Sequence, residues 1–155
     1  MAAILHAGKP LCGAVMISSK WLITAAHCFK AQRIDDGKLK HTPHYIKVVM
    51  GSTKLSYPST TGSSSEQDRL ELEVETIIIH PSFNVNSNNV LLNDIALVKL
   101  KRTVLTDNTD LRYICYPQQT EQLPEKAKCY TAGWGLTDYR NGNGTIIIII
   151  CYFLT

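Results

Sequence analysis

The chain has 155 residues, enough for one ordinary domain or for part of a larger one. Its hydrophobic fraction of 45% and charged fraction of 19% exclude an intrinsically disordered chain and a long charged helix, because the first has fewer apolar residues and the second more charged ones. Sixteen lysines and arginines against thirteen acidic residues give a net charge of +3, too small to indicate a nucleic acid or an anionic membrane as a partner.

The apolar residues fall into short runs separated by polar turns. In chain order the runs occupy 11–17, 21–26, 45–50, 70–79, 95–100 and 129–134. The run at 70–79 opens with leucine or valine alternating with glutamate, the pattern of a strand with one face in solvent. No segment keeps a helical period long enough to compete with this pattern. The sequence therefore predicts an all-β protein, either a barrel or a sandwich.

Three polar segments, at 30–44, 56–68 and 84–89, are predicted to be surface loops. The end of the chain is different, because five consecutive isoleucines occupy 146–150. A membrane span needs about 20 apolar residues, and this run has about half that number, so no span is expected. The run could be a core strand, but its monotony favours an aberrant tail. We therefore expect a domain over residues 1–144 and an apolar tail over 145–155.

The chain contains five cysteines, namely Cys12, Cys28, Cys115, Cys129 and Cys151. An odd number leaves at least one thiol without an internal partner. No two are spaced C-x-x-C, so disulfides are favoured over a zinc ribbon, and disulfides form in an oxidising compartment. The first residues, however, contain neither a basic leader nor the apolar run of a secretory signal. Either the compartment is not oxidising or the true start of the protein lies upstream of Met1.

Residues 21–28 read Trp-Leu-Ile-Thr-Ala-Ala-His-Cys, so an imidazole follows two small residues at the end of a predicted strand. Small residues let another group approach closely, and histidine is the side chain best suited to proton transfer near neutral pH. A bond between Cys12 and Cys28 would close a short loop and fix the segment that carries His27. Taken alone, the segment is equally compatible with a histidine that has no chemical role.

Asp94 stands at the head of another apolar run, in Asn-Asp-Ile-Ala-Leu-Val-Lys-Leu at 93–100. A carboxylate that enters a core needs a charged partner or donated hydrogen bonds. His27 is a suitable partner, because Asp94 could accept from one ring nitrogen, fix the tautomer and stabilise the imidazolium formed in a reaction. The alternative is a loop aspartate that precedes an edge strand.

Together and in this order, these segments closely resemble the chymotrypsin-like (trypsin-family) serine peptidases. The resemblance covers about residues 3–136 and is carried by Leu-Cys-Gly at 11–13, Thr-Ala-Ala-His-Cys at 24–28, Ile-His-Pro-Ser-Phe at 79–83, Asn-Asp-Ile-Ala-Leu at 93–97, Ile-Cys-Tyr-Pro at 114–117 and Ala-Gly-Trp-Gly at 132–135. The second and fourth of these motifs are very specific in combination. The resemblance implies two packed antiparallel β-barrels, of which this chain contains most of the first and only the beginning of the second.

The resemblance also implies roles for single residues: His27 as general base, Asp94 as its orienting carboxylate, and a disulfide between Cys12 and Cys28. Cys115 and Cys129 match positions whose partners lie outside this chain, and Cys151 has no counterpart. The substrates of the complete protein would be peptides or proteins, and the protein would be secreted. His41 and His44 lack the companions of a zinc site, so neither a metal nor a cofactor is expected. Asn143, in Asn-Gly-Thr, is a possible glycosylation site if the chain enters the secretory pathway.

The sequence departs from the family pattern at both ends. It has no Gly-Asp-Ser-Gly-Gly segment to carry the nucleophile, and it lacks the Ile-Val-Gly-Gly-like segment of the mature N-terminus. We therefore expect a serine endopeptidase that uses acyl-enzyme chemistry in the complete protein, and a chain that is inactive as written. The alternative is a non-catalytic, protease-like binding or regulatory fragment.

Overall fold

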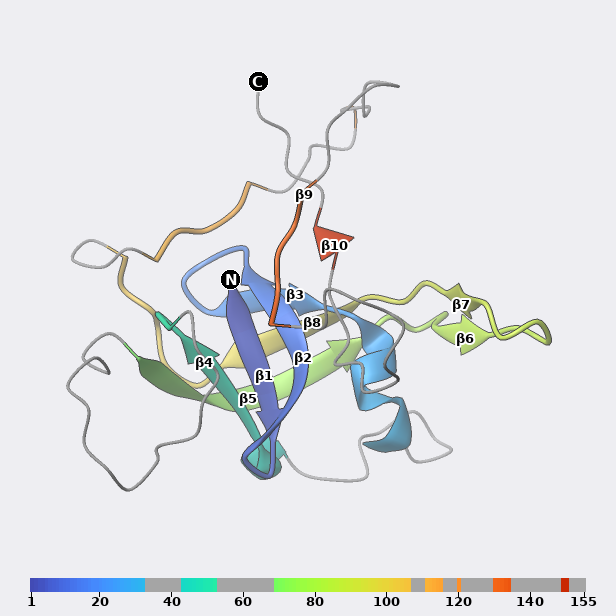
Figure 1. Cartoon of the computed structure of the whole chain (residues 1–155), viewed down its shortest axis with the longest axis horizontal. Coiled ribbons are helices and arrows are strands. Elements are labelled where there is room, and N and C mark those ends of the chain that lie inside the picture. The colour runs from blue at the N-terminus through green and yellow to red at the C-terminus, as the bar shows by residue number, and fades with distance from the viewer. Residues whose placement is uncertain are drawn as a thin grey trace.

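The computed structural model of the chain describes residues 1–32, 43–52, 69–106, 111–115, 120, 130–134 and 149–150. Its largest element is a closed barrel of antiparallel strands (Figure 1). The strands are β1 (Ala2–His6), β2 (Lys9–Met16), β3 (Trp21–Thr24), β4 (Ile46–Met50), β5 (Leu70–Ile79) and β8 (Ala96–Leu100). Around the barrel they follow the order β1-β2-β3-β8-β5-β4, and β4 closes the ring by pairing with β1. The prediction of an all-β protein with one nearly complete antiparallel barrel is confirmed.

Smaller elements surround the barrel in the described part of the chain. The 3₁₀ helix η1 (Ala26–Gln32) follows β3, and η2 (Pro43–Tyr45) precedes β4. A hairpin of β6 (Asn84–Val85) and β7 (Leu91–Leu92) projects beside the barrel (Figure 1). The prediction of a plain loop over 84–89 was therefore wrong at its start, because two-residue strands are too short to show any alternation.

Strand β5 shows how the sequence pattern becomes a barrel wall. Leu72 and Val74 are buried, whereas Glu71, Glu73 and Glu75 are exposed. Successive side chains of a strand point to opposite faces, so the leucine–glutamate alternation places one row in the core and the other in solvent. The strand bounds match the run predicted from the sequence.

Lysines from the neighbouring strands cover the acidic row of β5. Glu73 binds Lys101 at 2.7 Å and Lys47 at 3.3 Å, and Glu75 binds Lys99 at 2.8 Å. The hydrogen bond from Lys101 is the main cause that lowers the pKa of Glu73, and the bond from Lys99 lowers the pKa of Glu75. These pairs are open to solvent and contribute little to stability individually.

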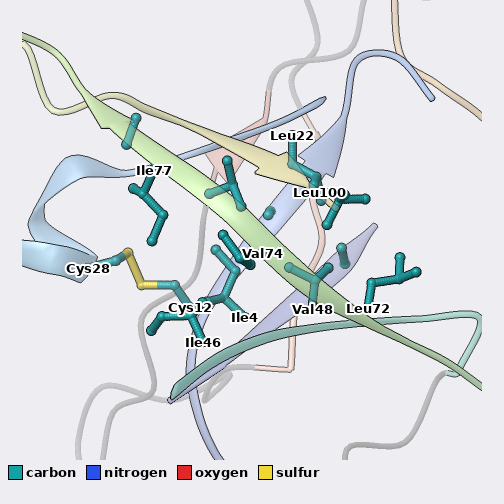
Figure 2. Packing of buried hydrophobic residues seen from close by; sticks show 14 of the residues in the cluster. Ile4, Cys12, Leu22, Cys28, Ile46, Val48, Leu72, Val74, Ile77 and Leu100 are labelled. Atoms are coloured by element: carbon teal, nitrogen blue, oxygen red, sulfur yellow. A yellow bond between two sulfur atoms is a disulfide. The ribbon is translucent and has the colours of Figure 1, made fainter. Parts of the chain in front are cut away.

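The barrel interior is a continuous apolar core to which all six strands contribute (Figure 2). Its largest fully buried side chains are Phe29, Ile4, Leu22, Met50, Leu72, Leu100, Val48, Val74, Val98 and Val104. Each large apolar side chain buried in this way contributes about 1.5–3 kcal/mol relative to an exposed one. Figure 2 shows the Cys12–Cys28 disulfide at one end of this cluster. The core therefore extends from the strands into η1.

Beyond the barrel, β9 (Tyr130–Thr131) pairs with β10 (Ile149–Ile150) in an antiparallel ladder, with Ile149 opposite Thr131. Two isoleucines of the predicted tail thus lie in a two-stranded sheet. The rest of the tail lies outside the described residues, as do Cys129, Cys151 and Asn143. No helix within the described residues has the length and apolar character required to cross a membrane.

Candidate active site

The pairing of β3 with β8 brings His27 and Asp94 together. Thr24, the last residue of β3, lies opposite Ala96, the first residue of β8. His27 follows Thr24 by three residues and Asp94 precedes Ala96 by two, so both leave the barrel at the same rim. In an antiparallel pair the end of one strand adjoins the start of the other. One strand register therefore places side by side two residues that are 67 positions apart in the sequence.

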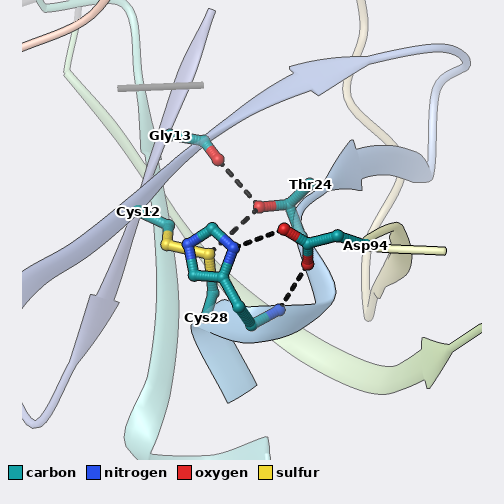
Figure 3. Close-up of polar contacts among 6 residues, drawn as sticks. Cys12, Gly13, Thr24, Cys28 and Asp94 are labelled. Carbon is teal, nitrogen blue, oxygen red and sulfur yellow. Dashed lines mark hydrogen bonds and ion pairs between the residues drawn. A yellow bond between two sulfur atoms is a disulfide. The ribbon is translucent and has the colours of Figure 1, made fainter. Parts of the chain in front are cut away.

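The carboxylate of Asp94, which is labelled in Figure 3, contacts His27 at two points. Its Oδ1 accepts a hydrogen bond from the His27 backbone N–H at 2.7 Å, and its Oδ2 lies 2.6 Å from Nδ1 of the ring. An ionised carboxylate can only accept, so the bond at Nδ1 requires that this nitrogen carry the proton. The neutral ring then has Nε2 as its acceptor, which is the tautomer required of a base.

The His27–Asp94 pair is partly shielded from solvent. The side chain of His27 is 20% exposed and that of Asp94 is 21% exposed. Hydrogen bonds to a charged acceptor are stronger than neutral ones, and exclusion of water strengthens them further. The remaining exposure leaves the ring reachable by another group. The arrangement can therefore hold a neutral imidazole, accept a proton on it and stabilise the resulting cation.

Three further contacts fix the segment that carries His27. The disulfide joins Cys28 in η1 to Cys12 in β2, with the two Cα atoms 6.2 Å apart. The hydroxyl of Thr24 donates to the Gly13 carbonyl at 2.8 Å (Figure 3). Phe29 is fully buried and anchors η1 in the core. Strand β2 and the core therefore both restrain the short stretch around the histidine.

The small residues before the histidine have a packing role. Ala26 has no exposed surface and belongs to the core cluster. A closely packed interior has no spare volume at such a position, so a larger side chain would displace its neighbours. The alanine therefore lets the chain turn from β3 into η1 against the barrel.

Cys12, His27 and Cys28 also bring three atoms of metal-ligating type within 4.8 Å of one another. The two sulfurs are bonded to each other, and a metal would need them as thiolates. We therefore interpret this group as a disulfide beside a histidine. His44 is exposed in η2, and His41, its partner in the sequence motif, lies outside the described residues.

Of the three cysteines predicted to be unpaired, one lies in the described part of the chain. Cys115 is an exposed free thiol in the described part of the chain. Cys129 and Cys151 fall in segments that the structure does not describe.

Sequence reasoning missed two residues of this site. Thr24 is 2% exposed and ties β3 to β2 through its hydroxyl, which makes it the buried polar residue beside the histidine. Asn93 precedes Asp94 and has a left-handed backbone, with φ of 52°. The available signal for Asn93 was its residue type, because asparagine is among the few residues that adopt this conformation readily.

Comparison with known proteins agrees with this fold. The sequence profile of the family described as Trypsin matches residues 1–147. Bovine tissue-type plasminogen activator is 35% identical over 128 residues, which cover 81% of this chain and 19% of that protein. Rat transmembrane protease serine 11G is 38% identical over 128 residues, covering 83% of this chain and 25% of that protein. The chain thus spans about a fifth to a quarter of the length of these curated relatives.

Among solved structures, human heparin binding protein superposes with a TM-score of 0.62 at 25% sequence identity. The superposition covers 87% of this chain and 51% of that one. The family profile covers the whole barrel and the positions of His27 and Asp94. The chain belongs to the trypsin family of chymotrypsin-like serine peptidases.

Proposed function

We propose that this chain is part of a serine endopeptidase in which His27 is the general base and Asp94 is the carboxylate that orients it. The observation that carries the proposal is the double contact of Asp94 with the backbone and the ring of His27. A structural ion pair needs only one contact. Simultaneous control of ring position and tautomer is what a base in nucleophilic catalysis requires.

The proposed reaction is acyl transfer from a peptide or protein substrate. A serine hydroxyl in the complete protein gives its proton to Nε2 of His27 and attacks the carbonyl carbon of the peptide bond. Asp94 stabilises the imidazolium, which then protonates the leaving amine. Water repeats the sequence on the acyl-enzyme and restores the serine.

The 155 residues contain no Gly-Asp-Ser-Gly-Gly segment, so this polypeptide holds a base without the matching nucleophile. Loss of the nucleophile alone costs about 10⁶-fold in a Ser-His-Asp peptidase of another fold. We propose that the chain as written does not cleave peptides. We also propose a partial peptidase domain at residues 1–144 with an aberrant tail at 145–155; the family match ends at residue 147.

A secreted or extracellular location is part of the same proposal. The Cys12–Cys28 disulfide supports it, because structural disulfides persist in oxidising compartments. One relative carries the name of a transmembrane protease, so attachment to a membrane through a further segment is compatible with the same site.

The second candidate is a non-catalytic binding or regulatory fragment. The likeness to a solved protein that is named for binding heparin favours it. A binding fragment has no need of a base held at two points, whereas a peptidase does. We therefore place the peptidase first.

Sequencing of the transcript beyond the codon for Gly144, followed by labelling of the encoded product with a fluorophosphonate probe, tests the proposal. We expect a downstream Gly-Asp-Ser-Gly-Gly-type segment, labelling of the longer product, and no labelling of the 155-residue chain. His27→Ala should abolish the labelling, and His44→Ala, which alters an exposed histidine in η2, should leave it unchanged. A transcript without such a segment contradicts the peptidase proposal and supports the binding fragment.

A further inference from the structure

Asn93 has an unusual backbone at a sensitive place. It directly precedes Asp94, and its φ of 52° lies in the left-handed region. Most L-residues are disfavoured there because the side chain approaches the following carbonyl, and asparagine is one of the few exceptions. The amide group of Asn93 is also used: Nδ2 donates to the carbonyl of Ser82 at 3.0 Å. The backbone conformation and the side chain of Asn93 thus both set the position of Asp94.

The backbone of Asp94 is also fixed on its other side. The N–H of Ile95 donates to the Asn93 carbonyl at 2.8 Å, so Asp94 is the central residue of a three-residue turn. The Ile95 carbonyl in turn accepts from the His80 N–H at 3.0 Å. Residues on both sides of Asp94 are therefore tied to the segment from His80 to Ser82.

That segment is itself well anchored. The N–H of Phe83 donates to the His80 carbonyl at 2.9 Å, and the Ser82 N–H donates to Nδ1 of His80 at 3.1 Å. Phe83 is buried in the core cluster. The turn from His80 to Phe83 is therefore a firm support for the residues that flank Asp94.

The two bonds to His27 depend on the direction of the Asp94 side chain. Oδ1 must meet the His27 N–H while Oδ2 meets Nδ1, at 2.7 and 2.6 Å. A rotation at Asn93 would swing the following residue as a unit, because the peptide bond between them is planar. With about a fifth of each side chain exposed, water would replace a bond that is lost.

We propose that Asn93 is a positioning residue for Asp94: its left-handed backbone and its bond to Ser82 aim the carboxylate at both donors of His27. The inference rests on the proposed function, because it explains how that base is oriented. In this role Asn93 acts through Asp94.

The matched control lies in the same chain. Asn89 also has a left-handed backbone, with φ of 59°, in the turn of the β6–β7 hairpin, where its N–H donates to the Asn86 carbonyl. Replacement of either asparagine by alanine imposes the same backbone penalty. Only the change at Asn93 acts next to the carboxylate.

The test uses the full 155-residue chain labelled with ¹⁵N-histidine. The Nδ1 proton of His27 reports the ring bond through its chemical shift, and exchange of the His27 amide reports the backbone bond. Asn93→Ala should move the Nδ1 proton upfield and accelerate His27 amide exchange by about tenfold, the effect of one lost hydrogen bond. Asn93→Gly, which tolerates the left-handed φ but lacks the amide, should give a smaller change of the same sign.

Asn89→Ala should leave both His27 signals unchanged. The inference is overturned if Asn93→Ala leaves them unchanged as well, or if Asn89→Ala alters them equally, which would indicate general loosening. If Asn93→Ala fails to fold, Asn93→Gly decides, and unaltered signals in that variant overturn the inference. Failure of the proposed function has a different signature, namely the absence of fluorophosphonate labelling in a product that carries the serine segment.

Discussion

Asp94 binds the backbone N–H and the ring Nδ1 of His27 at the same time, at 2.7 and 2.6 Å. The first bond fixes the chain at the histidine, and the second fixes the ring and its proton. A histidine bound only through its ring could move with its own backbone. The two bonds together hold the imidazole of a short 3₁₀ segment in a defined position.

The contact of Asp94 with Nδ1 of His27 predicts the effect of Asp94→Asn. The asparagine amide has almost the same shape, but its N–H₂ would donate toward Nδ1 and favour a ring protonated at Nε2, where it cannot act as a base. In the complete protein we expect kcat for peptide hydrolysis to fall about 10⁴-fold. Steady-state kinetics checks this result. A fall of less than about tenfold would show that Asp94 does not set the tautomer.

The disulfide predicts a loss of stability when it is removed. Cys12 and Cys28 are 16 positions apart, and a loop of this size corresponds to about 3 kcal/mol in the chain-entropy account. The double variant Cys12→Ser/Cys28→Ser should therefore unfold at a markedly lower urea concentration. Cys115→Ser is the control, since this thiol is exposed and free and its change should leave the midpoint in place. Equal midpoints for both variants would contradict the prediction.

The anchoring of η1 predicts a large effect of Phe29→Ala. This side chain is fully buried beneath the histidine-bearing segment, and removal of a buried aromatic side chain costs about 3–5 kcal/mol. Chemical denaturation measures the loss. Val90→Ala, at a position that is 50% exposed, should change stability by less than about 0.5 kcal/mol. Equal losses of stability for the two substitutions would show that Phe29 does not anchor η1.

The acidic row of β5 predicts how stability depends on pH. The bonds of Glu73 to Lys101 and Lys47 hold its pKa below the ordinary glutamate value of 4.5. Its folded pKa is therefore the lower one, so the contribution is fully present above pH 4.5 and disappears as pH falls through the folded pKa. Glu73→Gln should flatten the stability profile at acid pH and leave its slope near neutrality unchanged.

Urea titrations between pH 2 and 7 would measure this effect, with about 0.1 M salt to keep screening constant. Glu71→Gln is the matched control on the same face of β5, because its side chain has no lysine bond among the described residues. Identical acid slopes in the wild type and the Glu73→Gln variant would show that these bonds do not persist in solution.

Strands were predictable from the sequence where apolar and polar residues alternate or where a clear turn ends the run. The run at 70–79 became β5 with the same bounds, since glutamates and apolar residues mark its two faces. Strand β1 did not emerge as a run of its own. Ala2, Ala3, Ile4 and Leu5 are all buried, so no alternation marks the strand, and alanine has a low preference for strands. Its place depends on pairing with both β2 and β4, which is tertiary information.

The candidate site likewise contains residues that the sequence pattern revealed and residues that it did not. The contact between His27 and Asp94 could be predicted because their motifs are specific and each residue is of an unusual type for its place. The supporting residues were not. Thr24 reaches Gly13 across a strand pair, and Asn93 reaches Ser82 across a turn, so both contacts depend on register and not on the local pattern. The helix η1 was also missed, because a short 3₁₀ segment held by a disulfide and one aromatic anchor has no periodic signal.

The central claim is that His27 and Asp94 form one hydrogen-bonded pair in the folded chain. A proton spectrum of the ¹⁵N-histidine-labelled chain, recorded for the wild type and for Asp94→Asn, tests it directly. We expect a far-downfield Nδ1 proton of His27 in the wild type, because its bond to the carboxylate is short, and loss of that signal in the variant. A wild-type spectrum without that proton, or a variant spectrum that retains it, would show that the two residues do not form this pair.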